Sequence, residues 1–237
     1  MGASDYVTLS RQSGLLSEMR IVANNIANAA TTGYRQEGLV FSEFVRAAEG
    51  QPSISMTRAQ VRNTSMAQGA MNQTNGPYDV AIEGDGFFMV ETPDGERLTR
   101  AGSFTPNADG DLVTMDGYRV LDAGGAPVFV PGGTTDIKIA RDGTISTGGR
   151  VLGQIGLYQP LDPTGLVRED GVMFRAEAGA DPVTEPSMLQ GFLEGSNVDP
   201  ILQVARMVDI QRGYELGQSF LEAEDQRIRN AVKTLIR

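Results

Sequence analysis

The sequence predicts an α+β protein in which long N- and C-terminal helices pair as a coiled-coil-like shaft, with an antiparallel all-β domain inserted between them. All 11 prolines lie between Pro52 and Pro200, and 22 of the 29 glycines lie between Gly69 and Gly195. The two strongest helix breakers are therefore concentrated in the middle of the chain. Apolar residues also recur every seven positions at both ends, which is typical of packed helices. We expect a helical arm over residues 1–34, an extended connector over 35–74, a β-rich domain over 75–190 and a second helical arm over 191–237.

The N-terminal arm carries two rows of residues at heptad spacing. The first row is Leu9, Leu16 and Ala23, and the second is Gln12, Met19 and Ile26. Gly33 follows two threonines, and glycine readily adopts the left-handed conformation that closes a helix. The arm is therefore predicted to be one amphipathic helix that ends near residue 30.

The C-terminal arm has the longer and clearer repeat. Its apolar row, at intervals of seven residues, is Met207, Tyr214, Leu221, Ile228 and Leu235. Asp199 followed by Pro200 is a helix start signal, because aspartate caps the first amide groups and proline suits the first turn. The pattern predicts a helix of about 35 residues, which is roughly 50 Å long at 1.5 Å per residue.

Short strands separated by tight turns are predicted between the arms. Asp-Gly pairs, which favour hairpin turns, occur at residues 85–86, 94–95, 109–110, 116–117, 142–143 and 170–171. Segments of strand length with β-branched or aromatic content are residues 79–83, 87–91, 112–114, 118–121 and 154–158. These features predict a compact antiparallel body of about six to ten strands.

The composition excludes much of the usual catalytic chemistry. The chain has no cysteine and no histidine, which rules out cysteine nucleophiles, disulfides, Ser-His-Asp triads and metal sites built on thiolates or imidazoles. The net charge is −10, and residues 51–200 hold 20 acidic against 10 basic residues. An acidic middle argues against a nucleic-acid partner, because phosphate binding needs a basic face. The sequence also shows neither a long apolar run of membrane-spanning length nor the opening of a cleaved secretory signal.

Two acidic segments could hold a ligand, but turn chemistry explains both more simply. Residues 107–111 resemble the start of a calcium loop, yet Leu112 and Tyr118 stand where such a loop needs glycine and glutamate. Glu83 and Asp85 could act as paired carboxylates, but they lie at a Gly-Asp-Gly turn. We therefore expect no catalytic, cofactor-binding or metal-binding residues and no small-molecule substrate.

Three asparagines stand out in the predicted N-terminal helix. Asn24, Asn25 and Asn28 lie within five positions, although asparagine costs about 0.5 kcal/mol of helix propensity relative to alanine. One interpretation is that their amides hydrogen-bond neighbouring helices and fix the register, as a buried asparagine does in coiled coils. The other is a solvated face near the end of the helix. The apolar rows pose a similar choice between contacts within the chain and contacts between copies, and their length favours neighbouring copies.

Several segments resemble the signatures of bacterial flagellar basal-body rod and hook proteins. At the N-terminal end they are Tyr6-Val-Thr-Leu-Ser-Arg-Gln12, Ile21-Val-Ala-Asn-Asn-Ile-Ala-Asn28 and Thr31-Thr-Gly-Tyr-Arg35. At the C-terminal end they are Gly191-Phe-Leu-Glu-Gly-Ser-Asn-Val-Asp199 and Gln211-Arg-Gly-Tyr-Glu215. Residues 82–90 and 98–104 also resemble this family. Within it, the opening segment and the short middle are most similar to the proximal rod proteins.

The resemblance implies a non-enzymatic axial subunit that leaves the cell through the flagellar type III apparatus, without a cleaved signal, and polymerises helically in the periplasm. It implies that the N-terminal helix and its exit include Asn24, Asn25, Asn28, Thr32, Gly33 and Tyr34. It implies that the returning helix and its start include Asn197, Gln211 and Tyr214. Phe41-Ser-Glu-Phe-Val45 resembles a short export motif in which Phe41 and Val45 are the apolar positions.

The sequence thus predicts a structural subunit of the proximal rod that transmits torque. Its expected partners are further copies of itself, other rod proteins and the export apparatus, and the two helical rows are its expected assembly surface. One alternative is a distal rod or hook-like paralogue. Another is a surface binding protein on a coiled-coil stalk, which would need a secretory signal and would normally have a single helical arm.

Overall fold

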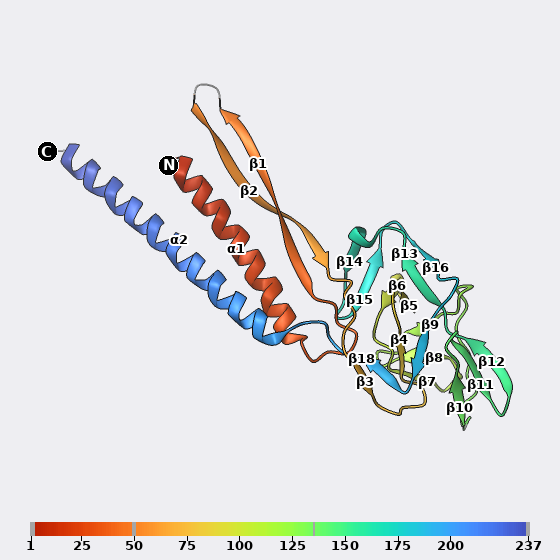
Figure 1. Cartoon of the computed structure of the whole chain (residues 1–237). Helices are drawn as coiled ribbons and strands as arrows, with labels where there is room; N and C mark the ends of the chain where they lie inside the picture. Colours follow the sequence, from red (N-terminus) through yellow and green to blue (C-terminus); the bar gives the residue numbers. More distant parts are fainter. Residues whose placement is uncertain (1–2, 49–50, 135, 236–237) are drawn as a thin grey trace. The chain divides into compact units, whose positions relative to one another are not determined.

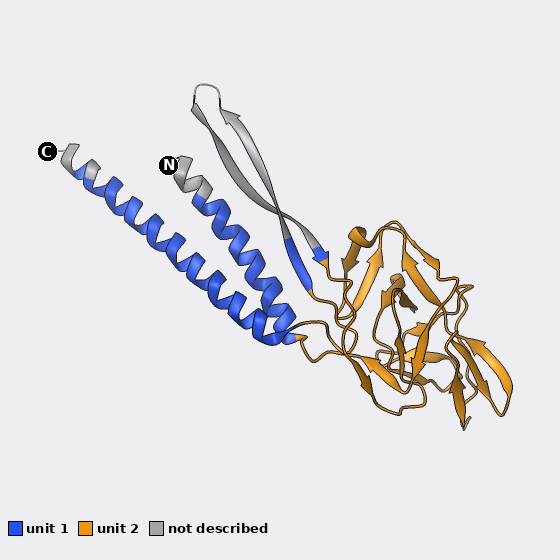
Figure 2. Ribbon diagram, in the orientation of Figure 1, with its two compact units in different colours: residues 1–27, 37–63, 199–237 blue, residues 28–36, 64–198 orange. Residues whose placement is uncertain are grey.

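The computed structural model describes residues 3–48, 51–134 and 136–235, and the chain divides into two compact units (Figure 2). The helical unit comprises residues 1–27, 37–63 and 199–237, and the β unit comprises residues 28–36 and 64–198. The chain therefore passes between the units four times. Among the described residues, no helix combines the length and the apolar character needed to cross a lipid bilayer.

Two long α-helices dominate the helical unit. Helix α1 spans Ala3–Ala27 and helix α2 spans Pro200–Leu235, and they lie side by side in antiparallel directions (Figure 1). Helix α2 begins at the predicted Asp-Pro signal, because Asp199 Oδ1 accepts hydrogen bonds from the backbone amides of Ile201 at 2.9 Å and Leu202 at 3.2 Å. Strands β1 (Glu37–Ala48) and β2 (Gln51–Thr64) form a two-stranded sheet, and β1 contacts α1.

The expectation of a coiled-coil-like shaft is wrong, although the α+β class agrees with the structure. Helix α1 has 25 residues and α2 has 36, so α1 cannot cover the apolar row of α2 along its whole length. A coiled coil also needs the same row to face the partner throughout its length. Leu9 and Leu16 of the first predicted row are instead exposed, while Gln12 and Leu15 lie against α2. The seven-residue spacing is present in both helices, but α2 packs against one shorter helix, and that helix also contacts β1.

The β unit is built from antiparallel strand pairs. Its largest sheet has nine strands in the order β14-β15-β6-β5-β9-β8-β7, and β13 joins it by pairing with both β5 and β16. Three smaller sheets have the orders β10-β11-β12, β17-β4 and β18-β3. The unit also contains a short 3-10 helix over Pro163–Gly165.

The strands of the β unit are mostly short. From β3 to β10 they are β3 Met71–Gln73, β4 Val80–Ile82, β5 Phe87–Thr92, β6 Gly95–Thr99, β7 Phe104–Pro106, β8 Leu112–Thr114, β9 Arg119–Val120 and β10 Ile137–Ile139. From β11 to β18 they are β11 Thr144–Thr147, β12 Arg150–Gln154, β13 Leu157–Pro160, β14 Leu166–Arg168, β15 Met173–Ala176, β16 Ala180–Pro182, β17 Met188–Gln190 and β18 Phe192–Glu194.

The predicted Asp-Gly turns are confirmed by backbone geometry. The glycine of each of the six pairs has a positive φ: Gly86, Gly95, Gly110, Gly117, Gly143 and Gly171. In the segment that resembles a calcium loop, Asn107 Oδ1 accepts hydrogen bonds from the amides of Asp109 at 2.9 Å and Asp111 at 2.8 Å. This side-chain oxygen is therefore committed to a turn.

One predicted strand is broken. Residues 154–158 divide into the end of β12 at Gln154 and the start of β13 at Leu157. Between them Gly156 runs so close to another loop that an added Cβ would lie 2.5 Å from the carbonyl carbon of Asp122. The chain changes sheets at this glycine, and a local run of β-type residues does not reveal such a change.

Strand β5 explains why the apolar run at residues 87–90 is continuous. Phe88 and Val90 lie in one core cluster, whereas Phe87 and Met89 lie in a second cluster that also contains Phe174. Successive side chains of a strand point to opposite faces, so both faces of β5 are buried. Burial of each such side chain contributes about 1.5–3 kcal/mol.

Candidate functional site

The two helices approach each other closely at glycines of α2. An added Cβ at Gly213 would lie 3.6 Å from the Leu15 side chain, and one at Gly217 would lie 3.3 Å from Nε2 of Gln12. Further along the pair, the Arg206 guanidinium lies 2.7 Å from the Glu18 carboxylate. Small residues at 213 and 217 therefore let α1 pack directly on the α2 backbone.

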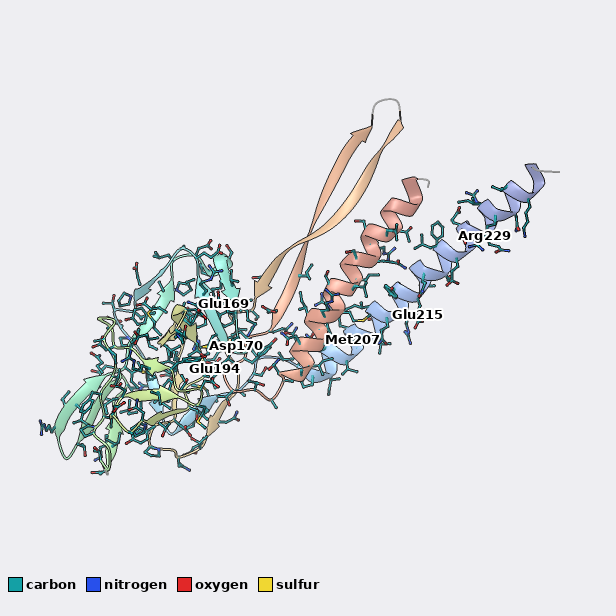
Figure 3. The ribbon with its side chains drawn as sticks, turned by 180° about the vertical axis from the view of Figure 1, so that it is seen from behind. Glu169, Asp170, Glu194, Met207, Glu215 and Arg229 are labelled. Atoms are coloured by element: carbon teal, nitrogen blue, oxygen red, sulfur yellow. The ribbon has the colours of Figure 1, made fainter. Side chains whose placement is uncertain are left out.

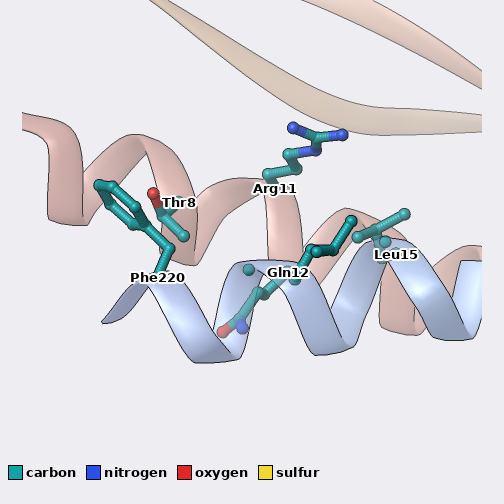
Figure 4. A pocket seen from close by; sticks show the side chains of 8 residues that line it. Thr8, Arg11, Gln12, Leu15 and Phe220 are labelled. Atoms are coloured by element: carbon teal, nitrogen blue, oxygen red, sulfur yellow. The ribbon is translucent and has the colours of Figure 1, made fainter. Parts of the chain in front are cut away.

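A groove of about 320 Å³ lies between the helices, and Figure 4 shows several of its side chains. Its lining residues are Thr8, Arg11, Gln12, Leu15, Gly213, Leu216, Gly217 and Phe220. Nε2 of Gln12 is buried there without a hydrogen-bond partner among the described residues. The groove is thus a partly apolar surface that the described part of the chain leaves uncovered.

The structure divides the predicted helical rows between covered and open positions. Half-buried positions are Met19, Ile26, Met207, Tyr214 and Leu221. Exposed positions are Leu9, Leu16, Ala23, Asn24, Gln211 and Ile228. The side chain of Leu235 lies outside the described residues, as do those of Phe41 and Val45 in the resembled export motif. Only part of each row is therefore used to pack α1 on α2.

Helix α2 has another apolar face that the sequence analysis missed. Ile201 is 81% exposed, and Val204 and Val208 follow it at intervals of three and four residues and are also exposed. Leu216, near the groove, is 72% exposed. The spacing of three and four residues was the available signal, but the seven-residue row obscured it. Exposed apolar side chains on several faces of one helix mark a surface that a partner can cover.

Asn25 joins separate elements of the helical unit through its side-chain amide. Its Nδ2 donates to the carbonyl of Glu37 at 2.8 Å, and its Oδ1 accepts from the amide of Glu37 at 3.0 Å. The same Nδ2 lies 3.4 Å from Oε1 of Gln203 on α2. All three residues are buried. One side-chain amide thus connects α1, the first residue of β1 and α2 within the helical unit, which agrees with the interpretation that asparagine fixes the register.

The segment that leaves α1 is held tightly in the β unit. Asn28 begins a turn in which its carbonyl accepts from the amide of Thr31 at 3.1 Å, and Thr32 is half-buried beyond it. Gly33 has a φ of 70° and donates its amide to the Glu194 carbonyl at 2.8 Å, while an added Cβ would lie 2.3 Å from the Ala101 nitrogen. Glycine is therefore required at this position on two grounds, the left-handed φ and the close approach. Tyr34 follows it and is fully buried.

Asn197 performs a similar linking role within the β unit. Its Oδ1 accepts from the amide of Gln36 at 2.6 Å, and its Nδ2 donates to the carbonyl of Ala67 at 2.7 Å. Its own amide donates to the Tyr34 carbonyl at 3.3 Å. Three segments that are far apart in the sequence therefore meet at Asn197.

Glu194 is the centre of this arrangement and was not among the predicted site residues. Its carboxylate oxygens lie 3.1 Å from the guanidinium of Arg35 and 3.1 Å from that of Arg100, and Oε1 also accepts from the amide of Gly69 at 2.9 Å. All three charged side chains are at most 2% exposed. Figure 3 shows Glu194 within the β unit. Charged residues are rarely buried unless paired, but the sequence does not show which charges will meet.

Two cations share this single buried carboxylate, and their pKa values reflect it. The pKa of Arg100 is lowered to about 10: burial has the largest effect and the nearby charge of Arg35 acts in the same direction, while Glu194 and Asp85 oppose both. Burial likewise lowers the pKa of Arg35, with Glu194 and then Asp85 acting in the opposite direction. Both guanidinium groups still carry their charge at neutral pH. Glu194 is therefore the main counter-charge of the junction, which we define as Gly33–Arg35, Gly69, Arg100 and Glu194–Asn197.

Three models of known protein families match separate parts of the chain. A model described as flagella basal body rod protein matches residues 6–35, which include most of α1 and the segment that leaves it. A model of the flagellar hook protein FlgE/F/G D1 domain matches residues 81–147, inside the β unit. A model of the flagellar basal body rod FlgEFG protein C-terminal matches residues 189–234.

Full-length relatives decide the family. The flagellar basal-body rod protein FlgF of Caulobacter vibrioides is 38% identical over 240 residues, covering 97% of this chain and 96% of its own length. The FlgF protein of Mesorhizobium japonicum is 36% identical and covers 99% of this chain and 98% of itself. This chain belongs to the flagellar basal-body rod protein family. The rod protein is a structural subunit of the flagellum, and its relatives imply assembly with other rod components.

The rod protein is also similar to FlgG proteins, at lower identity. FlgG of Agrobacterium fabrum is 32% identical and covers 89% of this chain and 90% of its own length. Both kinds of relative are flagellar basal-body rod proteins. The resemblance to this family and to FlgF within it, as read from the terminal signatures, is confirmed.

Proposed function

We propose that this chain is a subunit of the proximal rod that polymerises helically with copies of itself and with other rod proteins, and that it transmits torque without bond chemistry. The apolar side chains left open on the helical unit carry this proposal. After α1 and α2 have packed, Leu9, Leu16, Ile201, Val204 and Leu216 remain exposed. Contact with neighbouring subunits would remove this apolar area from water.

The charge distribution supports the same surface. The helical unit contains 11 acidic and 11 basic residues, whereas the β unit contains 19 acidic and 9 basic residues. Neighbouring helical units can therefore approach without net repulsion, while the β units repel one another. We infer that copies associate through the helical unit and that the β unit contributes the acidic surface of the assembly.

We further propose an assembly role for the predicted site residues of the helices and their exits. Asn24, Gln211, Leu9, Leu16, Ala23 and Ile228 would contact neighbours directly, because their side chains are exposed. Asn25, Asn28, Thr32, Gly33, Tyr34 and Asn197 would act indirectly, by holding the helix exits in one conformation. The half-buried Met19, Ile26, Met207, Tyr214 and Leu221 would contribute to both. Leu235 stays a prediction.

Proximal and distal rod positions remain two candidate functions. Identity favours the proximal position, because the FlgF relatives are 34–38% identical, whereas the FlgG relatives are 28–32% identical. Export through the flagellar type III apparatus into the periplasm, without a cleaved signal, is part of the same proposal. Imaging of purified basal bodies that carry this subunit with a bulky label would locate it. A label at the hook-proximal end would favour the distal alternative.

The test of assembly is a triple substitution, Leu16→Gln, Val204→Gln and Leu216→Gln. Because all three side chains are already exposed, the isolated protein should keep its circular dichroism spectrum and its melting temperature within roughly 2 °C. Incorporation into basal bodies, measured by immunoblot of purified particles, should be lost. The matched control is Met115→Gln, which changes an apolar side chain of the β unit that is 76% exposed. Normal incorporation of the triple variant would refute the proposed surface.

A further inference from the structure

Arg168 occupies an unusual position at the edge of the large sheet. It is the last residue of β14, the terminal strand of that sheet, and it pairs with Phe174 of β15. Its guanidinium carbon lies 4.3 Å from the centroid of the Tyr34 ring and 4.5 Å from the centroid of the Phe174 ring. Tyr34 belongs to the segment that leaves α1, so one cation contacts aromatic rings from two distant parts of the chain.

The same guanidinium is also fixed by hydrogen bonds. Nη1 donates to the Gly171 carbonyl at 2.6 Å, and Nη2 donates to the Arg35 carbonyl. Gly171 lies in the turn between β14 and β15, near the labelled Glu169 and Asp170 in Figure 3. Arg168 therefore joins this hairpin to the segment Tyr34–Arg35 by one ring contact, with Tyr34, and one hydrogen bond, to the Arg35 carbonyl. A planar guanidinium can make these contacts together, whereas a lysine ammonium cannot.

The buried surroundings strengthen the contacts between the Arg168 guanidinium and the two aromatic rings. Tyr34 and Phe174 are at most 1% exposed, and a cation over an aromatic ring is attracted more strongly where water is excluded. The same segment holds Gly33 and Arg35, whose bonds to Glu194 form the junction. Arg168 lies 133 residues after Arg35 in the sequence. None of the matched family models covers this part of the chain.

We propose that Arg168 is a positioning residue that clamps the segment 31–36 onto the β14–β15 hairpin, and so determines how firmly the exit of α1 is held within the β unit. The consequence for torque rests on the proposed function: load that reaches this segment enters the large sheet through Arg168 as well as through Glu194. An alternative is that Arg168 only covers aromatic surface, in which case any long side chain would serve.

Hydrogen exchange of the full-length protein, followed by mass spectrometry or NMR, tests the clamp. The relevant amides are those of Gly33, Tyr34 and Asn197, which donate to Glu194, Thr31 and Tyr34 respectively. In Arg168→Ala their exchange rates should rise about tenfold, since a desolvated cation–π contact and its hydrogen bond are lost. Amides of the β5–β6 ladder should exchange as in the unchanged protein. Arg168→Lys should also raise the exchange rates, because lysine keeps the charge but not the planar contacts.

The matched control is Arg150→Ala, which removes an exposed arginine at the start of β12. It should leave all of these amides unchanged. Unchanged exchange at Gly33, Tyr34 and Asn197 in Arg168→Ala would overturn the proposal, as would an equal rise in the β5–β6 ladder. If Arg168→Ala does not fold, Arg168→Lys decides by the same criteria. Incorporation into basal bodies is measured separately, so a failed clamp and a failed rod assignment give different results.

Discussion

Removal of the charge on Glu194 is expected to destabilise the β unit strongly. Glutamine at this position keeps the shape and can still accept from Gly69, but it leaves Arg35 and Arg100 without the carboxylate that lies 3.1 Å from each. Loss of one partner of a buried ion pair typically costs about 3–5 kcal/mol, because the remaining charge is desolvated and unpaired. Since one kcal/mol shifts the melting temperature of a unit of this size by roughly 2–4 °C, Glu194→Gln should lower it by about 6–20 °C.

Urea unfolding of the full-length protein, followed by tyrosine fluorescence and circular dichroism, measures this loss. Urea is preferable to guanidinium chloride, because an ionic denaturant would screen the charges under test. The matched control is Glu185→Gln, which neutralises an exposed glutamate of the same unit. This control should change the free energy of unfolding by less than about 0.5 kcal/mol.

The double variant Glu194→Gln with Arg100→Met tests the physical reason. If the cost comes from an unpaired buried cation, removal of that cation should recover part of it, and the two changes should be non-additive by more than about 1 kcal/mol. Strict additivity, or a loss in Glu194→Gln no larger than in the control, would show that the junction does not depend on this charge.

Three further outcomes are expected. Asn25→Ala should cost about 2 kcal/mol in the helical unit, because the amide and carbonyl of Glu37 each lose a buried partner. Thermal unfolding is the measurement, and a cost no greater than in Gln211→Ala would contradict the linking role of Asn25. Gly33→Ala should prevent stable folding or lower the free energy of unfolding by more than about 3 kcal/mol, since the new Cβ would lie 2.3 Å from a backbone nitrogen. Its control is Gly117→Ala, where the new Cβ meets open space and the loss should be only about 1 kcal/mol. Similar melting temperatures for the two glycine variants would be inconsistent with the geometry. Hydrogen bonds from Arg175 and then Arg97 lower the pKa of Glu169 below its usual 4.5. The stabilising contribution of the Glu169 carboxylate is therefore complete above pH 4.5 and is lost as the pH falls through the lowered pKa. Between pH 5 and pH 2.5, the melting temperature should fall less in Glu169→Gln than in the unchanged protein.

The local elements of this protein follow from local residue chemistry. A proline-free stretch with a seven-residue apolar repeat at each end predicts α1 and α2, and Asp199-Pro200 predicts where α2 begins. Asp-Gly pairs likewise predict turns, since glycine pays little for a positive φ, and all six pairs adopt one. These signals involve neighbours within about four residues, so a single sequence contains them.

Only the tertiary structure decided which helix faces are buried and which charged side chains pair. Heptad spacing shows that Leu9 and Leu16 lie on one stripe of α1, but not whether that stripe faces α2, and here it is left open while Gln12 and Leu15 make the contact. The two arginine partners of Glu194 lie 94 and 159 residues away from it in the sequence. The Arg35 carbonyl that accepts from Arg168 lies 133 residues away from it. Periodicity reports which residues share a direction, whereas burial and pairing depend on which distant segments fold back against them. For that reason the sequence alone identified helices, turns and family, and the fold alone revealed which side chains hold the exits of the helices and which remain open for a partner.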